Sequence, residues 1–200
     1  MSRWYRCGFL LVLVLSACAL PSKRQITAPA TWAPHQASVM PIIGWNITGR
    51  LVIADDKHAW NLQFSWEQHQ DHFLITLRDP LGRQVALMNG NADWVKLIDA
   101  KQVEYQDQHP ESLLQRVTGY RMPITNLQKW ILGLPVGAQV ADQSWDEQGR
   151  LLSFAEDGWL LEYKKYDASK DIALPSKLFL SRAPYQVKIL VSKWSEVSFR

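Results

Sequence analysis

Alternation of apolar and polar side chains, repeating every two residues, is the feature that most constrains the fold of this chain. The alternating apolar positions of the first two runs are Trp60, Leu62, Phe64, Trp66, Phe73, Ile75 and Leu77. A β-strand points successive side chains to opposite faces, so each run predicts a strand with one buried face and one face in water. Val85 and Leu87, and then Val95 and Leu97, extend the pattern.

Short turn signals between the runs predict hairpins. Asn89-Gly90, Gln148-Gly149 and Asp157-Gly158 favour tight turns, and Ala183-Pro184 separates the last two runs. Later strands are expected at residues 151–154, 159–163, 178–180 and 187–191. Consecutive hairpins with short connections predict an antiparallel meander that curls over a core.

Two helices are expected in the middle of the chain. Residues 111–118 follow Pro110, place leucine and valine at helical spacing, and stop at Gly119. Residues 127–131 repeat this spacing before Gly133 and Pro135. A sheet with one apolar face must be covered, and these helices are the available cover. The fold class is therefore mainly β with a few helices.

The N-terminus predicts export. Arg3 and Arg6 precede an apolar run at residues 9–15, which ends in Leu-Ser-Ala-Cys. This arrangement is typical of a cleaved signal peptide, residues 1–17, and the apolar run is too short to span a membrane. The ending resembles the bacterial lipoprotein signal, in which the cysteine, here Cys18, is lipidated. An ordinary secretory signal cut near Ala17 is the alternative.

The segment after Cys18 is expected to be a tether. Residues 18–30 lack apolar periodicity and contain two prolines, whereas residues 31–200 are expected to form a single domain. Ala19 follows the cysteine where an aspartate would favour retention at the inner membrane, so the resemblance implies transport to the outer membrane. Residues 31–40 have room for one or two helical turns between the limits set by Pro34 and Pro41.

Charge and residue content argue against several functional classes. The formal net charge of +3 includes Arg3 and Arg6, so the mature chain is nearly neutral and no nucleic-acid partner is expected. Cys18 is the only cysteine after the signal, which leaves no intramolecular disulfide. His69 and His72 lie in a polar stretch without a third ligand in view, so we expect no metal site. No phosphate loop, nucleophile elbow or paired carboxylates occur, and we expect neither a cofactor nor an enzyme.

One turn carries an unusual side chain. Asp79-Pro80-Leu81-Gly82 has the residue types of a type I turn, but Leu81 stands third, where a polar residue is usual. Leu81 either folds back onto a neighbour or is displayed to touch lipid or an acylated cargo.

Several segments in order resemble the LolB family of outer-membrane lipoprotein receptors. They are the lipoprotein signal, Leu-Arg-Asp-Pro-Leu-Gly at residues 77–82, Arg-Val-Thr-Gly at 116–119, Met-Pro-Ile at 122–124 and Trp-Ile-Leu-Gly-Leu-Pro at 130–135. The last segment is the most specific. The similarity extends from about Trp45 to Trp194, in addition to the signal.

The resemblance implies a fold and a function. The fold is a curved antiparallel sheet, an incomplete β-barrel, lidded by α-helices around a hydrophobic cavity. The function is to accept acylated lipoproteins from the periplasmic carrier LolA and to insert them into the inner leaflet of the outer membrane. The family's protruding loop corresponds to Pro80, Leu81 and Gly82, with Leu81 at the position needed for insertion.

The candidates for the acyl-chain cavity are the alternating residues of the first two runs. They are Trp60, Leu62, Phe64, Trp66, Phe73, Ile75 and Leu77. Plain core packing is the alternative for each, and a shift of one residue in register would exchange the two faces. The sequence leaves open whether the nine tryptophans that follow the signal peptide fill a core or line a cavity.

Two rival functions remain. A lipoprotein could bind a small hydrophobic ligand in a similar half-barrel, with Leu81 merely structural, or could scaffold an envelope complex. The expected partners are LolA, acylated cargo and outer-membrane lipid through Cys18, and the protein is expected to be a monomer.

Overall fold

A single eleven-stranded antiparallel sheet makes up most of the computed structural model, which describes residues 27–91, 93–137, 139–169 and 171–200. Its strands are β1 (Ile42–Ala54), β2 (Ala59–His69), β3 (His72–Arg78), β4 (Gln84–Gly90), β5 (Val95–Asp99), β6 (Glu104–Asp107), β7 (Ala141–Trp145), β8 (Leu151–Glu156), β9 (Trp159–Asp167), β10 (Leu174–Arg182) and β11 (Tyr185–Phe199). The strand order is β6-β5-β4-β3-β2-β1-β11-β10-β9-β8-β7. The expected antiparallel meander is confirmed.

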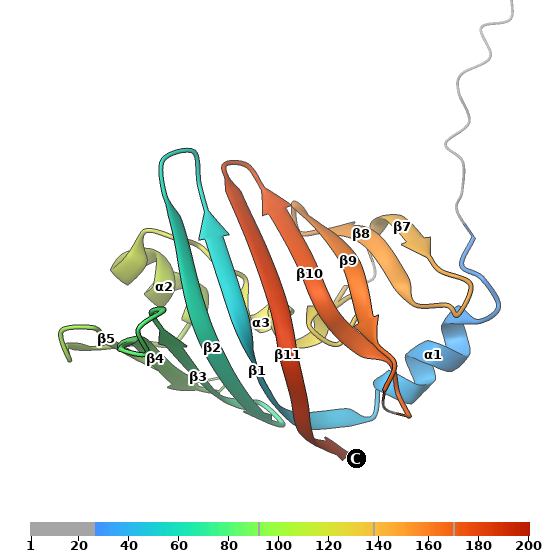
Figure 1. Ribbon diagram of the computed structural model, residues 1–200, viewed down its shortest axis with the longest axis horizontal. Helices are drawn as coiled ribbons and strands as arrows, with labels where there is room; N and C mark the ends of the chain where they lie inside the picture. The colour runs from blue at the N-terminus through green and yellow to red at the C-terminus, as the bar shows by residue number, and fades with distance from the viewer. Residues whose placement is uncertain (1–26, 92, 138, 170) are drawn as a thin grey trace, which may run out of the picture.

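The pairing of β1 with β11 joins the two ends of the meander. These are the longest strands of the sheet, and Figure 1 shows them side by side near its middle, between β2 and β10. Each half of the meander therefore extends outward from this central pair, and β6 and β7 stand at the two ends of the strand order. The sheet is open and curved.

Three helices accompany the sheet in the described residues. They are α1 (Trp32–Val39), α2 (Pro110–Thr118) and α3 (Ile124–Trp130). The two expected middle helices are confirmed, and α2 ends at Gly119, whose left-handed φ of 80° suits a residue without a Cβ. Helix α1 confirms the expected pair of turns, because Pro34 is tolerated in the first turn and the helix ends before Pro41.

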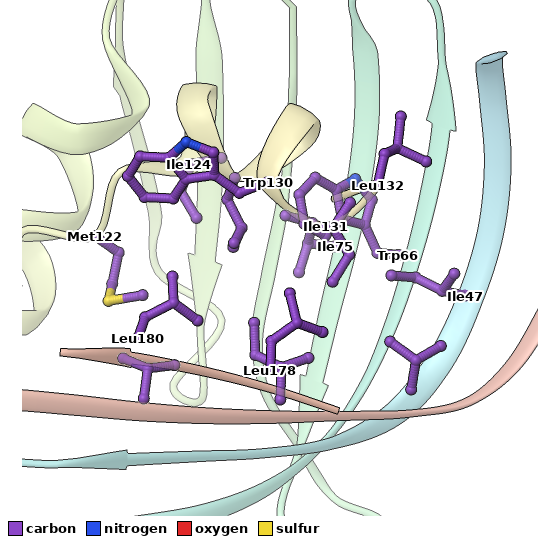
Figure 2. Close-up of a cluster of buried hydrophobic side chains, with 14 of the residues drawn as sticks. Ile47, Trp66, Ile75, Met122, Ile124, Trp130, Ile131, Leu132, Leu178 and Leu180 are labelled. Carbon is purple, nitrogen blue, oxygen red and sulfur yellow. The ribbon is translucent and has the colours of Figure 1, made fainter. Parts of the chain in front are cut away.

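The helical segment and one end of the sheet form a solid core. Trp130, Leu132 and Leu134 are buried together with strand residues such as Leu178 and Leu180. Figure 2 shows Met122, Ile124, Trp130 and Ile131 of this segment within the same cluster of buried side chains as residues from the sheet. Apolar burial of this kind is the main stabilising contribution to the fold.

One turn assignment was wrong. Asn89 and Gly90 lie inside β4, and the β4–β5 turn follows them, with the side chain of Asn91 accepting the backbone N–H of Trp94 at 3.1 Å. Gly90 meets a different requirement, since a Cβ there would lie 2.5 Å from the carbonyl oxygen of Trp94. The glycine permits a close approach of two strands rather than a turn.

The face assigned to Leu87 was also wrong. Leu77 pairs with Ala86, but the next pair is Arg78 with Gln84, so a register irregularity lies between them. This shift of one residue directs Ala86 and Met88 to the same face as Leu77 and places Leu87 on the opposite face, with Val85 as the extra, unpaired residue at the irregularity. The short strand β6 had no apolar alternation and was not predicted.

In the ranges that the structure describes, no helix combines the length and apolar character needed to cross a membrane. The signal, Cys18 and most of the tether lie outside the described residues.

Candidate functional site

The concave face of the sheet and the helices enclose a cavity of about 100 Å³. Apolar side chains alone line it: Leu51, Ile53, Phe64, Trp66, Ile75, Leu77, Ala86, Met88, Leu97, Leu114, Met122, Ile124, Leu127, Ile131 and Ile189. A cavity without a polar group offers nothing to hold an ion or an ordered water, but it matches a hydrocarbon. Its chemistry is that of a site for apolar groups.

The strand register builds the wall of this cavity. Trp66 lies opposite Ile75, which lies opposite Met88, which in turn lies opposite Leu97. These side chains form one row across four strands on the concave face. Phe64 and Leu77 begin the neighbouring row, which continues to Ala86. The wall thus follows directly from antiparallel pairing of alternating sequences.

The helical segment supplies the cover. Leu114 comes from α2, Ile124 and Leu127 from α3, and Met122 from the connection between the two helices. The flexible thioether of Met122 is suited to filling an irregular gap. We call residues 110–131 the lid.

The connection between α2 and α3 is held to two hairpins at the rim of the sheet. The Tyr120 ring makes edge contacts with Trp60 at 5.0 Å and with Tyr185 at 5.3 Å between ring centroids. Its hydroxyl donates to an Asp55 carboxylate oxygen at 2.8 Å. Because Asp55 follows β1 and Tyr185 begins β11, Tyr120 ties the lid to both central strands.

Hydrogen bonds perturb both ionisable groups of this contact. The backbone N–H of Lys57, the hydroxyl of Tyr120 and the backbone N–H of His58 lower the pKa of Asp55 to about 2. Loss of water around the phenol, together with the neighbouring Asp55 carboxylate, raises the pKa of Tyr120 to about 12. The pair is therefore an ionised carboxylate and a neutral hydroxyl at neutral pH.

Four of the seven residues named from the sequence line the cavity, namely Phe64, Trp66, Ile75 and Leu77. Trp60, Leu62 and Phe73 share the concave face but lie outside the lining, because the cavity occupies only the middle of these strands. Trp60 packs on Tyr120 at the rim, Leu62 lies opposite Leu51, and Phe73 lies opposite Gln68 near the other end.

The sequence reasoning missed most of the cover and part of the wall. Leu114 and Leu127 belong to the apolar faces of the predicted helices, and that signal was available. Leu51, Ile53 and Ile189 come from the central strand pair, whose closure depends on contacts between residues far apart in the sequence. The assignment of Met88 to the wall required knowledge of the register irregularity within β4.

The loop at residues 79–83 places Leu81 in solvent. The Leu81 side chain is 80% exposed, and its backbone N–H donates to the Asp79 carboxylate at 2.9 Å. The Arg83 guanidinium pairs with the same carboxylate at 2.6 Å. Leu81 therefore projects from a hydrogen-bonded turn and does not fold back onto a neighbour.

Two other loops have the same hydrogen-bond geometry. The first aspartate of each loop, Asp79, Asp99 or Asp146, accepts the backbone N–H groups two and four residues later. Their third positions hold Leu81, Lys101 and Gln148. Since lysine and glutamine occupy this position without altering the loop, the backbone does not require a leucine there.

A buried carboxylate holds the segment that follows the lid. Glu156 is buried and accepts the Trp130 indole N–H at 2.6 Å and the Val136 backbone N–H at 3.0 Å. The Gly137 backbone N–H donates to the same carboxylate. Burial of a carboxyl group without hydrogen-bond partners is unfavourable. These three donors supply the partners that Glu156 needs inside the protein.

The histidines considered for metal binding are not part of a larger ligand cluster in the described residues. His69 and His72 lie opposite each other at the β2–β3 turn, and the described ranges contain no group of three or more metal-ligating side chains. Residues 55–58 form a charged turn between β1 and β2.

Comparisons with known proteins agree with this architecture. The sequence profile of the family described as "Outer membrane lipoprotein LolB" matches residues 44–194. A protein of Pseudomonas syringae named "Outer-membrane lipoprotein LolB" is 33% identical over 190 residues, which cover 93% of each chain. A protein of Nitrosococcus oceani with the same name is 32% identical over 197 residues, 96% of this chain and 98% of its own.

Solved structures show the same fold at low sequence identity. A LolA superfamily protein from Nitrosomonas europaea superposes with a TM-score of 0.56 at 9% identity, covering 88% of this chain and 96% of its own. A DUF1329 family protein from Desulfovibrio piger has a TM-score of 0.52 at 10% identity, with 86% and 92% covered. The sequence relatives identify the family. Its members are outer-membrane lipoproteins and not enzymes. The chain belongs to the LolB family of outer-membrane lipoproteins.

Proposed function

We propose that this protein accepts acylated lipoproteins from the periplasmic carrier LolA and inserts them into the inner leaflet of the outer membrane. The observation that carries the proposal is the wholly apolar cavity under the lid. Exposure of an acyl chain to water costs roughly 0.8 kcal/mol per methylene, so an acylated cargo needs such shelter between carrier and membrane. No cofactor is required if each acceptor binds the cargo more tightly than the previous donor.

Acceptance of cargo requires the lid to move. The cavity of about 100 Å³ is smaller than the cavity of about 150 Å³ that holds one benzene molecule in another protein. It is therefore too small for an acyl chain. We propose that the lid moves away from the sheet while the rim contact of Tyr120 breaks, and that acyl chains take the place of Met122 and Leu127 against the strands.

Leu81 is proposed to deliver the cargo to the membrane. Its exposed side chain projects from a turn whose backbone does not need it, and a leucine at such a tip can enter the lipid interface. The role of Pro80 and Gly82 is to shape this turn. Cys18, by carrying lipid, is proposed to keep the domain near the membrane, so a form without Cys18 retains acceptance but loses its location.

The test is transfer of a labelled triacylated lipoprotein from purified LolA to this protein and then to liposomes. Wild type is expected to accept and deliver the cargo, whereas Leu81→Glu is expected to accept it without delivering it. Gln148→Glu places the same charge in a loop of the same geometry and is the matched control. If wild type takes nothing from the carrier, the proposal fails.

The small size of the cavity favours one rival, the binding of a small hydrophobic ligand. The two functions differ in their dependence on cargo. Only the first predicts that acylated proteins accumulate on the carrier when this chain is missing from the cell.

A further inference from the structure

Three lysines surround one aromatic ring on the convex face of the sheet. The ammonium nitrogens of Lys164, Lys177 and Lys188 lie 5.7, 5.4 and 5.6 Å from the ring centroid of Phe179. The lysines come from β9, β10 and β11, which are adjacent strands. Each ammonium is within the range of a cation–π interaction.

The strand register extends this cluster. Phe179 lies opposite Lys188, and Lys177 lies opposite both Lys165 and Leu190. Leu190 in turn lies opposite Arg50 of β1, so the cations continue across the central strand pair. We call this surface the basic face. It consists of Arg50, Lys164, Lys165, Lys177 and Lys188 around Phe179, Leu160 and Leu190, with the acidic Glu162 opposite Phe179 on the same face.

The charges of the basic face are poorly balanced within the protein. In the described part of the chain, Lys164 is the only one of these five cations with an ion pair, at 2.5 Å from Glu162. Like charges on directly opposed residues, as at Lys165 and Lys177, destabilise a sheet. Lysines often protect sheet edges, but β9, β10 and β11 are interior strands. An anionic partner outside the protein would neutralise these positive charges.

The apolar residues among the cations indicate the kind of partner. Leu160 is 41% exposed and Leu190 is 43% exposed, although both lie on strands whose opposite faces are buried. Lysine is depleted from protein–protein interfaces, whereas lysines mixed with leucine and phenylalanine are typical of surfaces that lie on anionic membranes. The cations would meet phosphate groups, and the leucines would reach the level of the glycerol backbone.

We propose that the basic face is a peripheral binding surface for anionic phospholipid bilayers. It is distinct from the Leu81 turn, since β3 and β4 are separated from β9–β11 by β1 and β2 in the sheet. The proposal does not depend on acceptance of cargo from a carrier. It assigns the convex face of the sheet to lipid headgroups and the concave face to acyl chains.

Vesicle sedimentation of the full chain tests this proposal. Binding is measured to vesicles of phosphatidylcholine alone and to vesicles that also contain phosphatidylglycerol, so an anchor or an apolar segment contributes equally to both. The wild-type protein is expected to favour the anionic vesicles, with a preference that falls as salt is added. Lys177→Gln combined with Lys188→Gln is expected to lower that preference roughly 25-fold, at about 5-fold for each lysine.

The matched control removes two exposed cations from the other side of the sheet, Arg121→Gln with Lys129→Gln. Equal binding to both vesicles, or equal losses in the two double variants, overturns the proposal. Unchanged vesicle binding with impaired transfer from the carrier also overturns it, because the basic face would then contact a protein. A chain that prefers anionic vesicles but takes no cargo would refute the proposed transfer function and leave the basic face standing.

Discussion

Two acidic side chains, Glu156 and Asp55, hold the helical lid in different surroundings. Glu156 is buried and binds donors at the C-terminal end of the lid and just beyond it. Asp55 lies at the rim and binds Tyr120 between α2 and α3. The first is suited to permanent structure, because removal of a buried acceptor leaves several donors unsatisfied. The second is suited to a contact that opens, because water can replace a hydrogen bond at the rim.

Replacement of Glu156 by alanine is expected to destabilise the protein by about 3 kcal/mol, since the Trp130 indole and two backbone N–H groups lose their acceptor. Glu156→Gln keeps one acceptor oxygen and is expected to cost about 1 kcal/mol. Urea unfolding followed by tryptophan fluorescence measures both changes. Equal stability of the alanine variant and wild type would show that the carboxylate does not hold this segment.

The rim contact predicts a response to acid. Asp55 has a folded pKa of about 2, so its contribution to stability is present above its unfolded pKa of about 4 and is lost as the pH falls through about 2. Tyr120→Phe removes one of the hydrogen bonds that lower this pKa, and the pKa of Asp55 is expected to rise. Carboxyl-carbon NMR titration measures it, with Tyr185→Phe as the control, because Tyr185 touches the Tyr120 ring without binding Asp55. If the pKa of Asp55 is the same in Tyr120→Phe and in wild type, the Tyr120 hydroxyl does not donate to Asp55 in solution.

At the scale of elements, the hairpin loops contain one residue that the turn geometry requires, the first aspartate, and one exposed residue that it does not require, at the third position. The three loops that begin at Asp79, Asp99 and Asp146 close with the same backbone hydrogen bonds, and their aspartates carry the shared geometry. The side chain at the third position is free to vary, as Leu81, Lys101 and Gln148 demonstrate. An exposed leucine at only one of these positions points to contact with something outside the chain.

Exchange of the third residues of two of these loops tests whether the turn geometry is independent of that side chain. Leu81→Gln and Gln148→Leu are each expected to change the free energy of unfolding by less than about 0.5 kcal/mol, because neither side chain is needed by its turn. Delivery of cargo to liposomes is expected to fall for Leu81→Gln alone. A large loss of stability on changing Leu81 would instead assign the leucine to the fold.

At the scale of the whole molecule, one half of the sheet forms the cavity wall and the other half packs into a filled core. The long β1–β11 pair joins the half that carries the cavity wall to the half that packs around Trp130. The filled half gives the lid a fixed attachment through α3. The other half keeps its middle open, where Ala86 stands among larger residues of the wall.

Filling of the cavity is expected to block the site without unfolding the protein. Ala86→Phe places a ring among the lining residues, with an overpacking cost of about 1–3 kcal/mol. Uptake of a fluorescent fatty acid and acceptance of cargo should both fall. Leu87→Phe is the control, because Leu87 is the neighbouring residue on the opposite face. Normal uptake by Ala86→Phe would show that acyl chains bind elsewhere.

Features that depend on local chemistry could be predicted from the order of the residues. Alternation around Phe64 and Ile75 predicted strands and their buried face, Gly119 predicted the end of a helix, and the residue types at 79–82 predicted a turn. The same turn residues left open whether Leu81 is exposed, and the structure shows that it is. The segment at residues 130–135 resembled the LolB family, and the family profile confirms that membership. Periodicity and turn chemistry act over a few residues, so these features can be predicted from the sequence alone.

Features that depend on strand register and on the pairing of distant segments could not be predicted in this way. The irregularity between Leu77 and Arg78 directed Met88 rather than Leu87 into the cavity, and the pairing of β1 with β11 brought Ile189 into its wall. The same pairing placed Arg50 beside the lysines around Phe179. Alternation states that two faces exist, but a shift of one residue exchanges them, and the neighbours of each strand follow from packing of the whole sheet.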